Sequence, residues 1–215
     1  MTYEIGPRKI YEYMLAKNHG RRRYEMKNKL FALVGPHASG KTAIVRELKK
    51  AGVNYIPLYT TRSPEAYARN PVDAAAMYRF MDKDDFLKQD FLVKITYKSE
   101  YYGMMKQEIL GALQSHPCSV VLSDAQGIKQ LSKLLKDSFE SIYVMVDYVT
   151  LVERMLRMKH TNDEIKYHIE YAESNGEFDT WKVSTHVVKN IISFETTVNQ
   201  ILAILGMTAP VSKQQ

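Results

Sequence analysis

A short run near residue 40 carries the residue types that bind phosphate groups. It fits the pattern G-x-x-x-x-G-K-[ST] and consists of Gly35, Pro36, His37, Ala38, Ser39, Gly40, Lys41 and Thr42. Glycines let a backbone wrap closely around an anion, so that successive N–H groups point inward. Lys41 can reach the β- and γ-phosphates of a nucleotide, and the Thr42 hydroxyl can ligate Mg²⁺. The run therefore predicts a phosphate site with an adjacent metal ligand.

The segments on either side of this run predict the elements that such a site needs. Residues 29–34 read as a short buried strand, and residues 41–51 read as a helix. The N-terminus of the helix would add the positive end of its dipole to the loop. This is the Walker A arrangement, the ATP-binding loop of P-loop nucleotide-binding proteins. The alternative interpretation is a Gly-rich turn that caps an ordinary helix.

The rest of the chain alternates between short apolar strands and helices. Further strands are predicted over 53–58, 77–81, 91–97, 118–123, 141–146 and 185–189, and further helices over 83–89, 104–115, 125–135, 149–159, 162–175 and 193–205. Such alternation implies crossover connections and an α/β fold with a P-loop NTPase-type parallel sheet core flanked by helices. In residues 77–104, aromatic-rich strands follow one another closely. That segment predicts a small, partly antiparallel insertion.

The composition excludes some classes of protein. The chain has 215 residues, 45% of them hydrophobic, which suits one α/β domain. No apolar run approaches the roughly 18 residues of a membrane span, and the N-terminus lacks the pattern of a secretion signal. The single cysteine, Cys118, rules out an internal disulfide, so we expect a cytoplasmic protein.

The net charge of +6 favours an anionic partner. One interpretation is nucleic-acid binding through Arg21–Arg23, which we disfavour because short basic runs are commonly just solvated. The other is an enzyme that handles anionic phosphates. A second basic cluster lies where a phosphate-handling lid would be, and it consists of Arg154, Arg157, Lys159 and His160.

Five short motifs follow the loop in a fixed order. They are Thr60-Thr61-Arg62-Ser63-Pro64, Tyr78-Arg79-Phe80, Asp84-Asp85-Phe86, Tyr101-Tyr102-Gly103 and Asp124-Ala125-Gln126-Gly127. In this order the chain resembles the guanylate kinase family, whose members show a TTR-x-P segment, a Y-x-F before an acidic helix, a YYG turn and a D-x-QG strand end. The resemblance covers about residues 29–205. It implies an ATP-dependent nucleoside monophosphate kinase of guanylate kinase type.

The resemblance also implies a domain organisation. Residues 1–28 would form an N-terminal appendage, and residues 29–207 a guanylate kinase-like domain. Within that domain we expect an insertion that binds the nucleoside monophosphate (NMP) at about 59–104 and a helical lid at about 154–175. Residues 208–215 would be a C-terminal tail.

By resemblance, several side chains receive roles in the reaction. Arg62 matches the arginine that grips the acceptor phosphate, a task that suits a planar fork of donors. Tyr78 and Tyr102 match two tyrosines whose hydroxyls reach the same phosphate, and Asp124 matches an aspartate that contacts the acceptor base. Three cations would join Lys41 in catalysis by closing over the γ-phosphate, and these are Arg154, Arg157 and Lys159. ATP would bind along the whole loop Gly35 to Thr42, with Mg²⁺ at Thr42.

The acceptor side departs from the family pattern. The positions at which the family reads guanine with polar groups are Leu58, Val93 and Met104 here, and these cannot supply hydrogen-bond acceptors for the base. Leu122 replaces a further aspartate, and Glu65 stands where a second phosphate-gripping arginine is expected. We therefore expect the acceptor to be GMP or a related nucleotide that an apolar pocket admits.

The lid departs from the pattern as well. Its glycines are absent, Lys159 stands where the lid arginine is expected, and His168 replaces a further arginine. A lysine is a point charge and clamps two phosphates less well than an arginine.

These departures leave two other functions open beside the kinase. One is a catalytically weak or inactive ATP-binding interaction module, although the loop is complete. The other is a kinase for a phosphorylated sugar, which would need no groups that read a base. Membrane association is not expected, and the sequence allows either a monomer or a homodimer.

Overall fold

The computed structural model describes residues 28–67 and 71–207. The predicted tail lies outside these described residues. So does the predicted appendage, apart from Asn28, and with it the basic run Arg21–Arg23.

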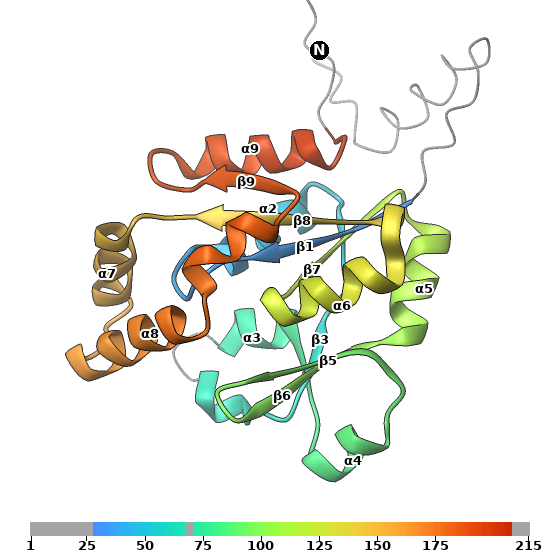
Figure 1. Ribbon diagram of the computed structural model, residues 1–215, viewed down its shortest axis with the longest axis horizontal. Helices are drawn as coiled ribbons and strands as arrows, with labels where there is room; N and C mark the ends of the chain where they lie inside the picture. The colour runs from blue at the N-terminus through green and yellow to red at the C-terminus, as the bar shows by residue number, and fades with distance from the viewer. Residues whose placement is uncertain (1–27, 68–70, 208–215) are drawn as a thin grey trace, which may run out of the picture.

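A five-stranded parallel sheet forms the centre of the described molecule (Figure 1). Its strands, in spatial order, are β2 (Asn54–Tyr55), β7 (Cys118–Leu122), β1 (Lys29–Val34), β8 (Phe139–Met145) and β9 (His186–Lys189). All neighbouring pairs are parallel. Strand β1 lies in the middle and is almost wholly buried, as expected for a parallel strand covered on both faces. The predicted parallel core is confirmed.

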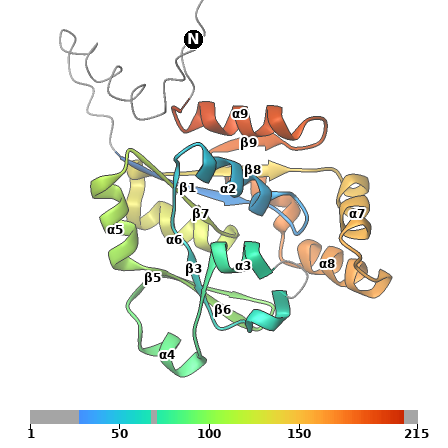
Figure 2. The ribbon, with the colours of Figure 1, turned by 180° about the vertical axis from the view of Figure 1, so that it is seen from behind.

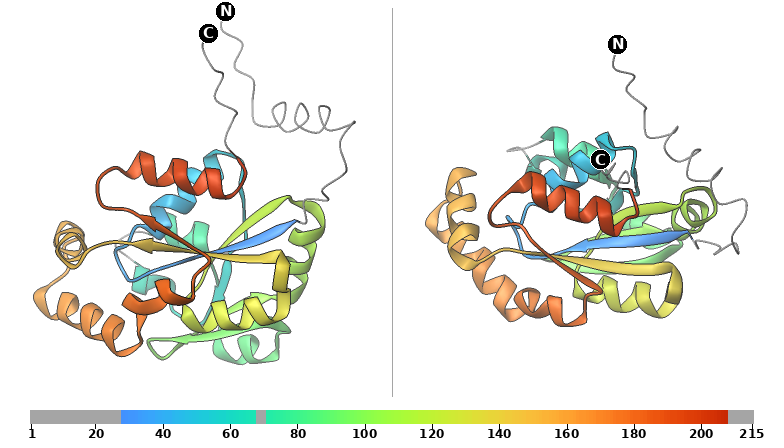
Figure 3. Two further views of the ribbon diagram at one scale, coloured as in Figure 1. Left: turned by 45° about the horizontal axis from the view of Figure 1, so that its top comes forward. Right: turned by 90° about the horizontal axis from the view of Figure 1, so that it is seen from above.

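Helices cover both faces of this sheet. In Figure 3, α2 (Lys41–Lys50) and α9 (Phe194–Ile204) lie on one face and α6 (Ala125–Leu135) lies on the other. Helix α5 (Lys106–Ser115) leads into β7. Buried apolar side chains of these helices, among them Ile44, Leu48, Leu131 and Ile201, join the strands in one continuous core.

A second, four-stranded sheet lies below the parallel sheet in Figures 1 and 2. Its order is β4 (Tyr78–Phe80), β3 (Leu58–Thr60), β6 (Glu100–Met105) and β5 (Phe91–Tyr97). Strands β3 and β4 are parallel, whereas β6 is antiparallel to both β3 and β5. The predicted small, partly antiparallel insertion is confirmed. Three short helices accompany it, namely η1 (Pro64–Tyr67), α3 (Pro71–Met77) and α4 (Lys83–Lys88).

The structure corrects the prediction in this insertion at three points. The strand predicted over 53–58 is two strands in different sheets, separated at Pro57, which lacks an N–H for either ladder. Tyr101-Tyr102-Gly103 is not a turn but lies inside β6. The turn is formed by Lys98 and Ser99, whose φ angles are +51° and +64°. Neither is a glycine or asparagine, so no residue there marks a turn. Helix α3 was also not predicted.

Two helices, α7 (Tyr148–Arg157) and α8 (Asn162–Ser174), project beyond the carboxyl end of β8 (Figure 1). A 3₁₀ segment, η3 (Glu177–Val183), then returns to pack against β8 and α6 before β9 begins. Five buried side chains give this region a small hydrophobic cluster of its own, formed by Val146, Leu151, Met155, Ile165 and Ile169. Helix α8 starts with a capping box between Thr161 and Glu164. Helix α8 and the last residues of α7 fall within residues 154–175, and the role of this region as a lid stays a prediction. A 3₁₀ turn, η2 (Lys136–Ser138), links α6 to β8.

Within the described part of the chain, no helix is both long enough and apolar enough to cross a membrane.

Candidate functional site

A cavity of about 1010 Å³ lies at the carboxyl edge of the parallel sheet. Its walls come from the loop after β1, the small sheet, the end of β7, and the helices α7 and α8. This edge is where α/β proteins generally bind ligands. The cavity therefore joins the predicted phosphate loop to the predicted insertion and lid.

The loop after β1 has the backbone of an anion site. Gly35 and Gly40 have φ angles of +143° and +100°. A Cβ at Gly35 would lie 2.8 Å from the carbonyl oxygen of Val144, and one at Gly40 would lie 2.6 Å from Nδ2 of Asn190. Only glycine fits at both positions, and Gly40 is the N-cap of α2. The loop thus presents a helix N-terminus to the cavity, as phosphate binding requires.

Lys41 is buried and folds back over this loop. Its Nζ donates hydrogen bonds to the carbonyl oxygens of Gly35 at 2.6 Å and Pro36 at 2.8 Å, and to Ser39 Oγ at 3.3 Å. Burial lowers the pKa of Lys41 to about 8, partly opposed by the carboxylate of Glu177. Phosphate oxygens are stronger acceptors than carbonyls, so an ammonium held here suits an incoming phosphate. Thr42 lines the same cavity, which fits a Mg²⁺ ligand beside that phosphate.

The small sheet contributes an arginine surrounded by tyrosines. The guanidinium of Arg62 lies 4.5 Å from the ring centre of Tyr67, and the hydroxyls of Tyr67 and Tyr102 are 3.2 Å apart. The ring of Tyr78 lies 5.1 Å from that of Tyr67 and 5.9 Å from that of Tyr102. Burial raises the pKa of Tyr78 to about 12. The structure thus brings Arg62, Tyr78 and Tyr102 together, and the Tyr78 hydroxyl stays a protonated donor.

Known proteins with similar sequences share one name. The chain is 29% identical over 143 residues to guanylate kinase of Chlamydia felis, a match that covers 63% of this chain and 66% of that protein. It is 26% identical over 189 residues to guanylate kinase of Koribacter versatilis, covering 84% and 78% of the two chains. No family model matches the chain.

The fold is also that of a solved guanylate kinase. The structure from Anaplasma phagocytophilum matches with a TM-score of 0.60 at 18% identity, over 84% of this chain and 86% of that one. In sequence and in fold, the chain is thus similar to guanylate kinases. The sequence motifs indicate the same family, and the matches to the proteins from Koribacter versatilis and Anaplasma phagocytophilum each cover 84% of this chain.

Two of the three positions at which the resemblance predicts guanine-reading groups are packed in the core. Val93 and Met104 face each other across β5 and β6 and are 1% and 0% exposed. Neither is among the described residues that line the cavity. Leu58 does line it, together with Leu122 and Ile95. The part of the cavity nearest the small sheet is therefore apolar at the positions where the guanylate kinase family carries polar groups.

Asp124 lies at the carboxyl end of β7 and lines the cavity. Its Oδ1 accepts a hydrogen bond from Gly127 N at 2.8 Å, which makes it the N-cap of α6. Burial raises the pKa of its carboxyl group. The structure thus gives it a helix-capping role, and contact with an acceptor base stays a prediction. Glu65 is exposed at the cavity rim and accepts a hydrogen bond from Ser63 Oγ.

The three predicted lid cations lie in different surroundings. Arg154 donates to the carbonyl oxygens of Ala38 at 3.3 Å, Ser39 at 3.1 Å and Asn190 at 2.7 Å, and so ties α7 to the phosphate loop. Arg157 lines the cavity and pairs with Glu153 at 3.3 Å. Lys159 is exposed, with φ of +61°, and is not among the described lining residues. Arg154 and Arg157 are thus placed beside the donor site, whereas Lys159 lies at its periphery.

Sequence reasoning missed four residues of this site. Asn190 follows β9, is 2% exposed, and donates to the carbonyl oxygen of Ser39 at 2.9 Å. A polar residue at the end of a parallel strand was the available signal. Tyr67, Lys98 and Glu177 also line the cavity. They come from a short 3₁₀ segment, an irregular hairpin turn and the segment after α8, where no periodic pattern marks a residue as functional.

Proposed function

We propose that the chain is an ATP-dependent nucleoside monophosphate kinase that transfers the γ-phosphoryl group of ATP to GMP or a related nucleotide. One observation carries the proposal: the phosphate loop with Lys41 and the Arg62–tyrosine cluster open into the same cavity of about 1010 Å³. A phosphoryl transferase needs such an arrangement, because donor and acceptor phosphates must meet in line.

The donor half would be formed by the loop, Lys41 and α7. Loop N–H groups and the N-terminus of α2 would hold the β- and γ-phosphates, and the Lys41 ammonium would leave its carbonyl partners for phosphate oxygens. Thr42 would hold Mg²⁺, which when bound neutralises charge on the transferred group. Arg154 would keep α7 against the loop, and Arg157 would approach the phosphates from the lid.

The acceptor half would be formed by Arg62 and its tyrosines. Arg62 can take two phosphate oxygens at once, and the hydroxyls of Tyr67, Tyr78 and Tyr102 can donate to others. Lys98 adds a second cation, whose pKa falls to about 8 through burial and repulsion by Arg62. An acceptor phosphate would relieve that repulsion. Because this phosphate is already ionised, the transfer needs no general base.

The acceptor base would lie against apolar walls. Leu58, Ile95 and Leu122 offer no hydrogen-bond partners to the edge of guanine. We therefore infer weak discrimination among bases. The same feature favours a second candidate, a kinase for a phosphorylated sugar, since such an acceptor has no base to be read.

An assay of ADP release tests the proposal. Purified protein is given ATP, Mg²⁺ and, in turn, each common nucleoside monophosphate and a ribose bisphosphate. We expect ADP release that depends on one or more nucleoside monophosphates and that falls by at least about 100-fold in Lys41→Met. Lys50→Met, which changes an exposed lysine of the same helix, should retain full activity.

Two outcomes would contradict the proposal. ADP release with the sugar bisphosphate alone would favour the second candidate. No ADP above background with any acceptor, together with ATP binding in a calorimetric titration, would favour the inactive interaction module.

A further inference from the structure

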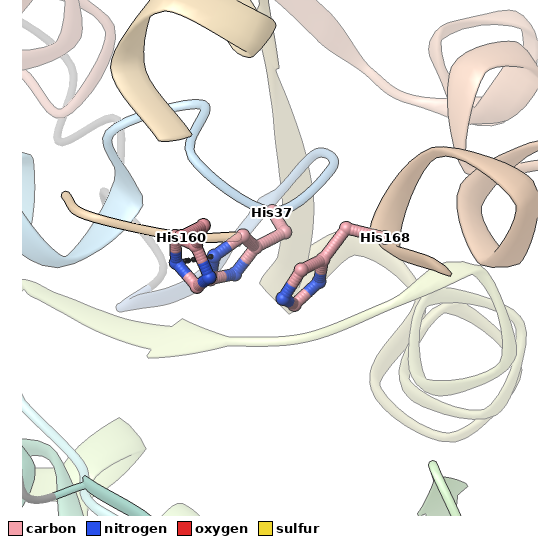
Figure 4. A group of neighbouring side chains, drawn as sticks. All are labelled: His37, His160 and His168. Carbon is pink, nitrogen blue, oxygen red and sulfur yellow. Dashed lines mark hydrogen bonds between the residues drawn. The ribbon is translucent and has the colours of Figure 1, made fainter. Parts of the chain in front are cut away.

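Three histidines from three separate segments meet at the mouth of the cavity (Figure 4). His37 is in the phosphate loop, His160 lies between α7 and α8, and His168 is on α8. The Nε2 atoms of His37 and His160 are 3.3 Å apart. The rings of His37 and His168 stack with their centres 3.8 Å apart. All three residues line the cavity.

The spacing of the ring nitrogens suits a tetrahedral metal ion. One nitrogen from each histidine can be chosen so that all three lie within 4.8 Å of one another. Two imidazole nitrogens on a tetrahedral zinc ion, each about 2.0–2.1 Å from it, are separated by roughly 3.3 Å. The pair formed by His37 and His160 already has this separation, and a side-chain rotation of His168 would bring the third nitrogen closer.

A carboxylate lies beside one of the rings. His160 Nδ1 lies 3.6 Å from Glu164 Oε2, and that oxygen also accepts a hydrogen bond from Thr161 N at 2.8 Å. Glu164 is therefore fixed by the capping box of α8. Metal-binding histidines usually have such a partner on the nitrogen that faces away from the metal. Here the partner leaves Nε2 of His160 directed toward His37.

We infer that His37, His160 and His168 form a binding site for a divalent transition metal of the zinc type, with a fourth coordination position open toward the cavity. Imidazole nitrogen selects zinc and its neighbours over Mg²⁺, which prefers oxygen ligands. The site is distinct from the Mg²⁺ position proposed at Thr42 and does not depend on the proposed kinase activity. A metal here would join the phosphate loop to the linker before α8 and to α8 itself.

Lys98 is the competitor of this metal. Its Nζ lies 2.8 Å from His168 Nδ1, where an ammonium occupies the lone pair and adds positive charge beside the site. The carboxylates of Glu164 and Glu177 offset part of that charge. Removing the Lys98 ammonium should therefore raise the affinity for a metal bound by His168. The affinity for a metal bound at other residues would not change.

Titration of the full chain with Co²⁺, in excess Mg²⁺ to occupy oxygen-ligand sites, tests the inference. We expect saturation at one Co²⁺ per chain with the strong visible absorption of four-coordinate Co²⁺, reversed by Zn²⁺. His160→Gln and His168→Gln should each weaken binding by at least about 100-fold, and Glu164→Gln by about 10-fold. Lys98→Met should strengthen it several-fold.

His116→Gln is the matched control, because His116 is exposed at the end of α5 and remote from the cluster in sequence. It should bind Co²⁺ as the wild type does, and thermal unfolding without metal should show that all variants are folded. Absence of saturable Co²⁺ binding by the wild-type protein would overturn the inference. So would binding that keeps its wild-type affinity in both His160→Gln and His168→Gln.

Discussion

At the scale of single residues, burial changes what ordinary side chains can do. Lys41 contacts carbonyl and hydroxyl oxygens of its own loop, and burial disfavours its charge. Burial raises the pKa values of Tyr67 and Tyr78, so both hydroxyls stay protonated beside Arg62. Lys41 and Arg62 are both suited to bind phosphate, because a phosphate group would supply a negative charge beside each of these cations.

Binding of ATP should therefore take up protons at alkaline pH. The pKa of Lys41 is about 8 in the folded chain and about 10.5 in an unfolded one. Between these values the unfolded chain binds more protons, so this group makes the ligand-free protein more stable as the pH rises. Phosphate favours the ammonium and raises its pKa again. ATP affinity should accordingly fall as the pH rises above about 8.

Calorimetry in buffers of different ionisation enthalpy measures this proton uptake. At pH 8 we expect about half a proton per ATP in the wild-type protein and clearly less in Lys41→Met. Equal uptake by the two proteins would show that Lys41 does not meet the phosphates.

The tyrosine hydroxyls should act on acceptor binding. Loss of one hydrogen bond to a charged group weakens binding by about 1.5 kcal/mol or more, so Tyr102→Phe and Tyr67→Phe should raise the acceptor KM by about 10-fold. The kcat should change little, because the lost contact holds the acceptor in both ground and transition states. Steady-state kinetics with the acceptor varied would measure this.

Tyr59→Phe is the control for these variants. The hydroxyl of Tyr59 donates to Glu108 at 3.1 Å, and neither residue is among the described lining residues of the cavity. An acceptor KM that rose equally in Tyr59→Phe would mean that the effect comes from the small sheet and not from the cavity.

At the scale of elements, sequence patterns predicted those structures that are formed by contiguous residues. The strand, loop and helix around Lys41 were all predictable, because the loop pattern and the apolar runs are contiguous in sequence. The hairpin between β5 and β6 was not, because Lys98 and Ser99 adopt positive φ without glycine or asparagine. Asn190 and the histidine cluster depend on segments that only the folded topology brings together.

The small sheet buries Val93, a position at which the family resemblance predicts a base-reading group. Val93 packs under the sheet against Met104. Val93→Glu should therefore lower the free energy of unfolding by at least about 3 kcal/mol, because it buries a charge without a partner. Thr96→Glu, at an exposed position of the same strand, should change it by less than about 0.5 kcal/mol.

Urea unfolding with an activity assay would check this pair. A Val93→Glu protein as stable as Thr96→Glu, with improved selectivity for GMP, would show that Val93 faces the acceptor base after all.

At the scale of the whole molecule, two sheets and a pair of helices enclose one cavity. The parallel sheet holds the donor loop, the small sheet holds Arg62, and α7 reaches back to the loop through Arg154. In the function we propose, the loop with Lys41 would hold the donor phosphates, and Arg62 with its tyrosines would hold the acceptor phosphate. The cavity wall formed by Leu58, Ile95 and Leu122 offers no polar groups to an acceptor base. The central claim is therefore a phosphoryl transferase with low discrimination among bases.

A competition assay tests that claim most directly. Equimolar nucleoside monophosphates are mixed with ATP, Mg²⁺ and the protein, and the diphosphate products are quantified together by mass spectrometry. An apolar pocket discriminates by no more than about 100-fold, whereas a site that hydrogen-bonds its substrate reaches about 10,000-fold or more. We predict transfer to more than one acceptor within that lower range. Transfer to GMP alone, at the higher level of selectivity, or no transfer to any acceptor, would contradict the account.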